Sequence, residues 1–383
     1  MHPFSQLEPT LSRNEPRIYL DHAATTPMRP EAVAAVMEGM ARWANPSSPH
    51  AEGRAARAAL EDARRRIAQA LGWPHHVILT SGASESASLA LRGRPGIGVA
   101  AVEHDAVLRA ADRPVMLDVD AGGIVSPLRT PALASSPLPF VSSEVEKHLL
   151  GAGLSTSLET NGERAPMITL QSANSETGVL QPAAATPRIA DCAQTAGKLP
   201  LPDADMIIVS AHKLGGPPGI GALLVRDLGL LDPTGGQERG YRGGTENLPG
   251  ALGFAAALEA PRDWFAPLAG LRAELDTAIL AHGGEIVAQA SPRIPTIASY
   301  RMPGVGAAAQ LIRLDMAGFA VSAGSACSSG SMRPSHVLAA MGYPADAAAQ
   351  VVRVSFGWTT TADDVARFAE AWTRIARDIR AAA

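Results

Sequence analysis

IIVSAHKLGGPPGIGALLV, residues 207–225, predicts a short apolar strand, a polar turn that carries Lys213, and a Gly-Pro loop that leads into a second apolar strand. An amine between a hydrophobic strand and such a loop can be partly desolvated, and desolvation lowers the pKa of an ammonium group toward the nucleophilic range. A solvated turn lysine is the alternative interpretation, because lysines in turns are common on surfaces. The rest of the chain has to separate the two.

A second strand and helix start lie upstream, in HVILTSGASESASLALRG at residues 76–93. The apolar run from Val77 to Leu79 predicts a strand that breaks at Gly82 and opens a helix with Ser84 in its first turn. Free backbone N–H groups at a helix start, together with the Ser84 hydroxyl, can hold a phosphate dianion. An ordinary N-cap is the competing interpretation.

Two further strand ends carry polar side chains. GVAAVEHDAVLRAA predicts a strand that ends near His104 and a helix after it, which puts His104 where ligands bind in open parallel sheets. IADCAQTAGKLP places Asp191 and Gln194 shortly before the strand that leads to Lys213. These side chains are therefore candidates for one site.

The pattern changes near Leu252, where long helical periodicity begins. We expect two domains, a large one over residues 17–251 and a smaller one over residues 252–383, with the first residues packing on the small one. VVRVSFGWTT predicts a strand that carries Arg353 in an apolar setting. Short strands are also expected near Ile286, Ile297 and Val321.

Composition excludes several classes of function. The 383 residues are 46% apolar and 18% charged, with a formal net charge of −4, so there is no electrostatic case for binding nucleic acid or an anionic membrane. No apolar run reaches membrane-spanning length, and the first residues have neither a signal-peptide core nor a transit-peptide pattern. Two cysteines cannot form a disulfide scaffold and favour a reducing compartment, so we expect a cytoplasmic protein.

One cofactor would use most of these strand-end groups. Pyridoxal 5'-phosphate (PLP) needs an amine for a Schiff base, an acid that keeps its pyridine nitrogen protonated, and a helix N-terminus for its phosphate. Lys213, Asp191 and the helix start at Ser84 supply these three features. The residues therefore favour a PLP site.

Eight motifs follow one another along the chain: YLDHAATTP, NPSSPHAEGR, TSGASES, EHDAVL, NSETGVLQP, SAHK, ERGYRGGTEN and GSACSS. With these motifs in this order, the chain resembles the cysteine desulfurases, which are class V, fold-type I PLP enzymes. The resemblance extends from about Tyr19 to Thr360, and it implies an α/β fold: a large domain with a mainly parallel seven-stranded sheet between helices, and a smaller α+β C-terminal domain. The segment GSACSSGS is similar to the group whose long Gly/Ser-rich catalytic-cysteine loop serves iron–sulfur cluster assembly.

The resemblance also implies roles at the cofactor. Lys213 would form the internal Schiff base and then move a proton between substrate and cofactor, and Asp191 would pair with the pyridine nitrogen. Gln194 would donate a hydrogen bond to the ring hydroxyl, and His104 would stack on the ring and relay protons. The other implied cofactor contacts are Ala83, Ser84, Ser210 and His212 around the phosphate, and Ser175.

Substrate and partner contacts are implied in the same way. Arg353 would grip the carboxylate of L-cysteine, a bidentate task that lysine does poorly, and Asn174 belongs to the same substrate-binding set. Thr245 corresponds to a residue that reaches the phosphate of the neighbouring subunit, which implies a homodimer with shared sites.

Cys327 is the implied nucleophile. Its thiolate would attack the sulfur of the cysteine–cofactor adduct, leaving a persulfide on Cys327 and releasing L-alanine, and a loop of Gly, Ser and Ala suits a side chain that has to travel. The sulfur would pass to an acceptor or iron–sulfur scaffold protein, with which Cys327 can also transiently ligate a cluster. No metal is expected in the PLP site itself, and Cys192 is expected to be a packing residue.

Three departures from the family pattern stand out. Ser175 stands where the family has the second of two consecutive asparagines, which normally contacts cofactor or substrate. Here this contact would be made by the shorter serine side chain or through a water. Between Gln181 and Asp191 the chain is several residues shorter than the family pattern, which predicts the loss of most of a helix and of the strand that normally presents the aspartate. The region from about Thr130 to Glu163 looks longer than usual.

The leading hypothesis is an L-cysteine desulfurase that feeds iron–sulfur cluster or thio-cofactor synthesis. A selenocysteine lyase or an aminotransferase of the same class would keep the cofactor and change the substrate, and an aminotransferase has no need of Cys327. A cofactor-poor sulfur-carrier or scaffold paralogue is the hypothesis from a different class, and Ser175 with the shortened segment favours it.

Overall fold

The main sheet of the computed structural model has seven strands in the order β2-β8-β7-β6-β5-β3-β4. The run from β4 to β7 is parallel, whereas β8 is antiparallel to both of its neighbours. The predicted α/β fold with a mainly parallel seven-stranded sheet is confirmed. The strands are β2 (His76–Thr80), β3 (Gly98–Ala100), β4 (Val115–Leu117), β5 (Ile168–Gln171), β6 (Ile189–Asp191), β7 (Met206–Ser210) and β8 (Gly221–Val225).

The structure describes residues 17–125, 167–182, 188–323 and 334–382. The candidate nucleophile Cys327 and the long region from about Thr130 to Glu163 lie outside these ranges. Within them, no helix is long and apolar enough to cross a membrane.

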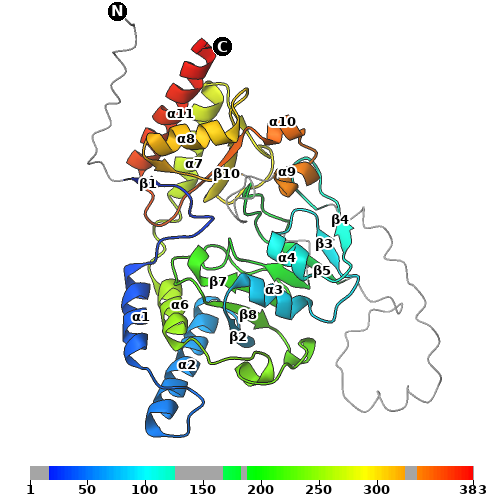
Figure 1. The fold of residues 1–383 in the computed structure, drawn as a ribbon, viewed down its shortest axis with the longest axis vertical. Helices are drawn as coiled ribbons and strands as arrows, with labels where there is room; N and C mark the ends of the chain where they lie inside the picture. The colour runs from blue at the N-terminus through cyan, green and yellow to red at the C-terminus, as the bar shows by residue number, and fades with distance from the viewer. Residues whose placement is uncertain (1–16, 126–166, 183–187, 324–333, 383) are drawn as a thin grey trace, which may run out of the picture.

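Helices cover both faces of the main sheet (Figure 1). On β7, Ile207 and Val209 pack into one apolar cluster, whereas Met206 and Ile208 pack into another on the opposite face. Successive side chains of a strand point to opposite faces, so a strand covered on both sides reads as a continuous apolar run. The first face is covered by α1 (Pro30–Ala41), α2 (Ala51–Ala70) and α6 (Leu248–Glu259), and the second by α3 (Ala83–Leu91) and α4 (Asp105–Ala110).

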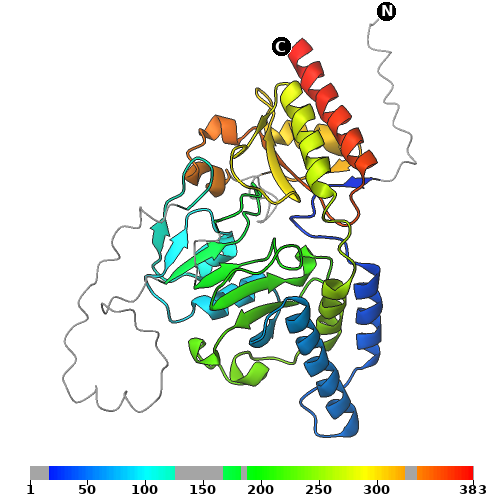
Figure 2. The ribbon, with the colours of Figure 1, turned by 180° about the vertical axis from the view of Figure 1, so that it is seen from behind.

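A second, smaller sheet lies above the main one in both views (Figures 1 and 2). Its strands are antiparallel, in the order β12-β10-β9, and a separate parallel pair joins β1 to β11. Its core contains the fully buried Tyr300, Phe368 and Trp372. The elements here are β1 (Ile18–Tyr19), α7 (Leu268–Ala281), β9 (Glu285–Ile286), β10 (Ile297–Arg301), α8 (Ala307–Met316), β11 (Phe319–Ala320), α9 (His336–Ala340), α10 (Ala345–Ala348), β12 (Val351–Ser355) and α11 (Ala362–Ala382).

The chain crosses between the two sheets more than once. The strand β1 pairs with β11 beside the smaller sheet, although its residues come first in the described chain. The expected boundary between residues 251 and 252 falls inside α6, whose apolar side chains pack with α1 and α2. That boundary stays a prediction.

The segments that follow the parallel strands meet the smaller sheet. The carbonyl oxygen of Glu103, after β3, accepts a hydrogen bond from His336 Nε2 at 2.9 Å. The carbonyl oxygen of Glu176, after β5, accepts one from Ser299 Oγ at 2.8 Å. Ligand sites of open parallel sheets lie at such strand ends, so this junction is where a site is expected. Three short 3-10 helices complete the description: η2 (Ala211–Lys213), η3 (Leu228–Leu230) and η4 (Glu238–Gly240).

Candidate active site

Lys213 ends η2, the single turn that follows β7. Its Nζ donates hydrogen bonds to the carbonyl oxygens of Ala23 at 2.7 Å and Ala24 at 2.8 Å. Both carbonyls belong to residues 21–25, called the N-terminal turn below, in which the Ala24 amide donates to the Asp21 carbonyl. The lysine amine is therefore held at the junction of the two sheets.

Asp191 lies at the carboxyl end of β6 and is buried. The expected loss of a strand before it is wrong, because β6 is present and pairs with β5 on one side and β7 on the other. A strand of three buried residues suffices when neighbours bond to both edges. Burial raises the pKa of the Asp191 carboxyl, while the positive charges of His104 and Lys213 act in the opposite direction.

Gln194 approaches the same turn as Lys213. Its Nε2 donates to the Ala23 carbonyl at 3.0 Å, so one oxygen accepts from both side chains. Its Oε1 is buried and has no hydrogen-bond partner among the described residues. A buried amide oxygen without a donor marks a place where a ligand donor fits.

The start of α3 provides an open set of backbone N–H groups. The helix begins at Ala83 after Gly82, whose φ of 147° lies in the range open to glycine, and no side chain caps it. A Cβ on Gly221 would lie 2.7 Å from the Gly82 Cα, so only glycine permits this approach of β8. A Cβ on Gly82 would lie 3.9 Å from Ser210 Oγ, which places that hydroxyl beside the helix start. Ser84, in the first turn, is exposed.

Two histidines flank these groups. His212 precedes Lys213, and its Nδ1 lies 3.2 Å from Thr25 Oγ1. Burial, followed by the charge of Lys213, lowers the pKa of His212 to about 4, so the ring is neutral at pH 7. His104 caps α4, with its Nδ1 accepting a hydrogen bond from the Ala106 amide at 3.1 Å.

Arg353 comes from β12 in the smaller sheet and is 6% exposed. Its guanidinium donates through Nη1 to the Ser175 carbonyl at 2.9 Å and through Nη2 to Asp21 Oδ1 at 2.8 Å. Asn174 builds the turn that presents this carbonyl, because its Oδ1 accepts from the amides of Glu176 and Thr177. Ser175 thus meets Arg353 through its backbone.

The remaining sequence-derived candidate is not tied to this group by the contacts above. Thr245 is exposed on the segment after η4. That segment starts from Glu238, whose buried carboxylate holds Arg64 at 2.5 and 3.0 Å. The roles expected for the individual site residues stay predictions.

Sequence reasoning missed two polar groups of the junction. Asp21 lies in the YLDHAATTP motif but was given no role, although an acid directly after a strand is a recognisable signal. Lys198 donates through Nζ to the Gln194 carbonyl at 2.9 Å. Burial, followed by the positive charge of Lys213, lowers the pKa of Lys198 to about 7.

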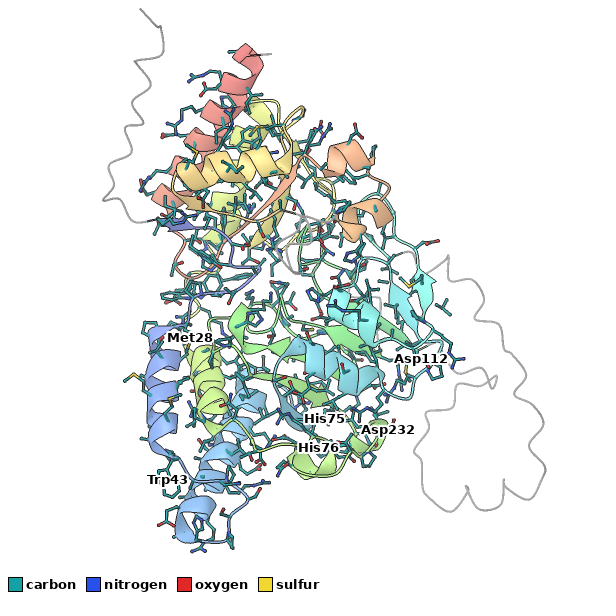
Figure 3. The ribbon with its side chains drawn as sticks, viewed as in Figure 1. Met28, Trp43, His75, His76, Asp112 and Asp232 are labelled. Atoms are coloured by element: carbon teal, nitrogen blue, oxygen red, sulfur yellow. The ribbon has the colours of Figure 1, made fainter. Side chains whose placement is uncertain are left out.

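Histidine and carboxylate side chains do not gather into a metal site in the described part of the chain, where no group of three or more His, Cys, Asp or Glu could hold an ion. Figure 3 shows His75 and His76 near the lower edge of the main sheet, away from the smaller sheet. They are therefore remote from the junction.

Known proteins are similar to this chain in both sequence and architecture. The family model described as aminotransferase class-V matches residues 18–115 and 152–368. A cysteine desulfurase from Frankia sp. (strain EuIK1) is 36% identical over 95% of this chain and 92% of its own. The NifS-like protein from Rickettsia africae ESF-5 has a TM-score of 0.77 at 27% identity, covering 94% of this chain and 99% of its own. SspA, solved in complex with cysteine, has a TM-score of 0.69 at 27% identity over 90% and 100% of the two chains. The chain therefore belongs to the aminotransferase class-V family, as its ordered motifs indicate.

Proposed function

We propose that this protein is an L-cysteine desulfurase that uses PLP, converts L-cysteine to L-alanine and retains the sulfur as a persulfide on Cys327. The observation that carries the proposal is the N-terminal turn. Its carbonyls bind the Lys213 amine, and its Asp21 carboxylate binds the Arg353 guanidinium. A nucleophilic amine and a carboxylate-binding cation thus lie around one short turn, as chemistry on an amino acid requires.

The residues present fit PLP. The buried Gln194 Oε1 lacks a donor among the described residues, and the start of α3 has no side-chain cap. Asp191 would face the pyridine nitrogen, Gln194 and His104 the ring, and Ala83, Ser84, Ser210 and His212 the phosphate, with Ser175 near the substrate side. When bound, PLP supplies an electron sink that stabilises negative charge at the substrate carbon.

The protein's own groups then bind the substrate and move protons. Arg353 holds the substrate carboxylate, and Asn174 keeps the Ser175 turn in place through its backbone hydrogen bonds. Lys213 Nζ leaves the Ala23 and Ala24 carbonyls and, as a neutral amine, takes and returns a proton at the substrate carbon. His104 Nδ1 accepts from the Ala106 amide, and we assign proton relay to its other ring nitrogen, Nε2.

Sulfur transfer is the step assigned to Cys327. Its Sγ bonds to the substrate sulfur while the carbon–sulfur bond of L-cysteine breaks, so one thiol and one cysteine become one persulfide and one alanine. The persulfide passes to a sulfur-acceptor or iron–sulfur scaffold protein. In a cytoplasmic homodimer, the exposed Thr245 would reach the neighbouring phosphate site.

The test is turnover of purified protein supplied with PLP, L-cysteine and a thiol reductant, with sulfide and alanine both quantified. With reductant we expect equal amounts of the two products and loss of both in Lys213→Ala. In a parallel sample without reductant we expect one added sulfur on Cys327 by mass analysis. Cys192→Ala is the matched control, because burial raises the pKa of that thiol to about 12 and keeps it unreactive. Full sulfide release by Cys327→Ala would contradict the proposal, and amino transfer to a keto acid that survives this change would favour an aminotransferase.

A further inference from the structure

Asp21 forms an ion pair with Arg353, the residue that would bind the substrate carboxylate in the proposed function. Its Oδ1 accepts from Arg353 Nη2 at 2.8 Å, and both side chains are largely buried, at 19% and 7% exposure. The Asp21 carboxylate therefore already binds the guanidinium that would bind the carboxylate of an amino acid.

Arg353 keeps unused donor capacity in this arrangement. A guanidinium has five N–H donors, and the Ser175 carbonyl and Asp21 take one nitrogen each. Its Nε is buried and has no hydrogen-bond partner among the described residues. Buried donors of native proteins are normally paired, so this Nε edge is where a further acceptor is expected.

The charge on this arginine is already compensated. The Asp21–Arg353 pair has no net charge, so a substrate carboxylate that binds beside it gains less attraction. The substrate carboxylate is also repelled by Asp21, and in a buried site this repulsion is weakly screened. We propose that Asp21 lowers the affinity of Arg353 for amino acid carboxylates and so speeds the release of L-alanine. This inference rests on the proposed function for the identity of the amino acid.

Asp21 is not needed to anchor the N-terminal turn. The Leu20 amide donates to Ala320, the Ser355 amide donates to Leu20, and the Ala23 amide donates to Ser355 Oγ at 2.9 Å. Tyr19 Oη donates to the Thr25 carbonyl at 2.9 Å. Asp21→Asn keeps an oxygen that accepts from Arg353 and removes only the charge, so the variant isolates the electrostatic effect.

The experiment measures calorimetric dissociation constants of L-alanine and L-alaninamide for the PLP-loaded protein, together with KM and kcat for L-cysteine. We expect Asp21→Asn to bind L-alanine about tenfold more tightly, because removal of one competing negative charge from Arg353, with its hydrogen bond kept, corresponds to roughly that factor. KM for L-cysteine falls with it, kcat falls as product release slows, and L-alaninamide binding stays unchanged. Asp21→Glu, which keeps the charge, is expected to stay near the wild-type constants.

Weaker or unchanged L-alanine binding in Asp21→Asn would overturn the inference, because an orienting role predicts loss of affinity. If that variant does not fold, the wild-type protein still gives a test. A ratio of L-alaninamide to L-alanine dissociation constants below about 100 supports a compensated arginine, and a larger ratio overturns it. Absence of L-cysteine turnover would contradict the proposed function while leaving the L-alanine measurement intact.

Discussion

Lys213 and Gln194 donate hydrogen bonds to the same oxygen, the carbonyl of Ala23, at 2.7 and 3.0 Å. One backbone atom of the N-terminal turn thus holds both the amine and the amide that the proposed cofactor site requires. In the proposed reaction Lys213 leaves this oxygen, and Gln194 would remain a donor to it.

Replacing Asp191 tests the acid of the site. Asp191→Asn keeps an oxygen for the hydrogen bond that the Ala193 amide donates at 2.8 Å, so the fold is expected to persist. Loss of the charge is expected to lower sulfide release by about 10²–10³-fold, the usual cost of removing one preorganised electrostatic contact. The exposed Asp112, at the outer edge of the main sheet in Figure 3, gives the control Asp112→Asn, which is expected to keep the wild-type rate. A rate for Asp191→Asn within a few-fold of wild type would rule out this role.

Acid stability is expected to depend on His22. Burial lowers the pKa of His22 to about 4 from an unfolded value of 6.5. Between these values the unfolded chain binds more protons than the folded one, so stability is lost as the pH falls from 6.5 to 4. Each such histidine contributes a slope of up to about 1.4 kcal/mol per pH unit. Urea denaturation across this window is expected to show a smaller slope for His22→Asn, and an unchanged slope would contradict the assignment.

Lys198 gives a second pH-dependent prediction at the opposite end of the scale. Its pKa falls from 10.5 to about 7, so the unfolded state binds more protons between these values and stability rises with pH across them. Lys198→Met loses the hydrogen bond to Gln194 at every pH, about 1 kcal/mol, but removes the cost of the buried charge. Its stability relative to wild type is therefore expected to be greatest at pH 7 and to decline toward pH 10.5.

Arginine at this position supplies the control for Lys198. Lys198→Arg keeps a cation that does not deprotonate in this range, so its stability deficit relative to wild type is expected to grow as the pH rises. Both variants are thus expected to lose stability relative to wild type as the pH rises. Lys198→Met starts from its greatest relative stability at pH 7, and Lys198→Arg starts from its smallest deficit. Chemical denaturation measures the unfolding free energy of both variants relative to wild type. If neither difference changed between pH 7 and pH 10.5, Lys198 would stay charged in the folded protein and its lowered pKa would be wrong.

The buried ion pair of Glu238 and Arg64 supports the segment that leads to Thr245. Glu238 Oε2 also accepts from the Leu79 amide at 2.9 Å, and its side chain is fully buried. Glu238→Ala leaves Arg64 with the more exposed Glu61 and the Val77 carbonyl, and it leaves the Leu79 amide without this acceptor, which is expected to cost about 3 kcal/mol of unfolding free energy. Asp62→Ala, which removes an exposed partner of Arg65, is expected to cost less than about 1 kcal/mol. Equal effects of the two changes in urea denaturation would contradict this account.

Sequence patterns predicted the strands around Lys213 well, because β7 and β8 are buried on both faces and read as unbroken apolar runs. The strand β6 was missed because three residues are too few to show a periodicity, and its stability comes from neighbours that are distant in sequence. The contact of Asp21 with Arg353 was invisible for a related reason. It depends on the pairing of β1 beside the smaller sheet, which no local pattern encodes.

Asp21 and Arg353 are 332 positions apart in sequence, and this separation sets the order of events during synthesis. A nascent chain that has emerged as far as the end of α6, at Glu259, already contains Lys213, Asp191 and the start of α3. It has no β12 and therefore no arginine for an amino acid. Domains fold as units while the chain emerges N-terminus first, so the nascent chain is expected to bind PLP on the ribosome before it can bind L-cysteine. A partly synthesised chain would then not bind L-cysteine until β12 has folded.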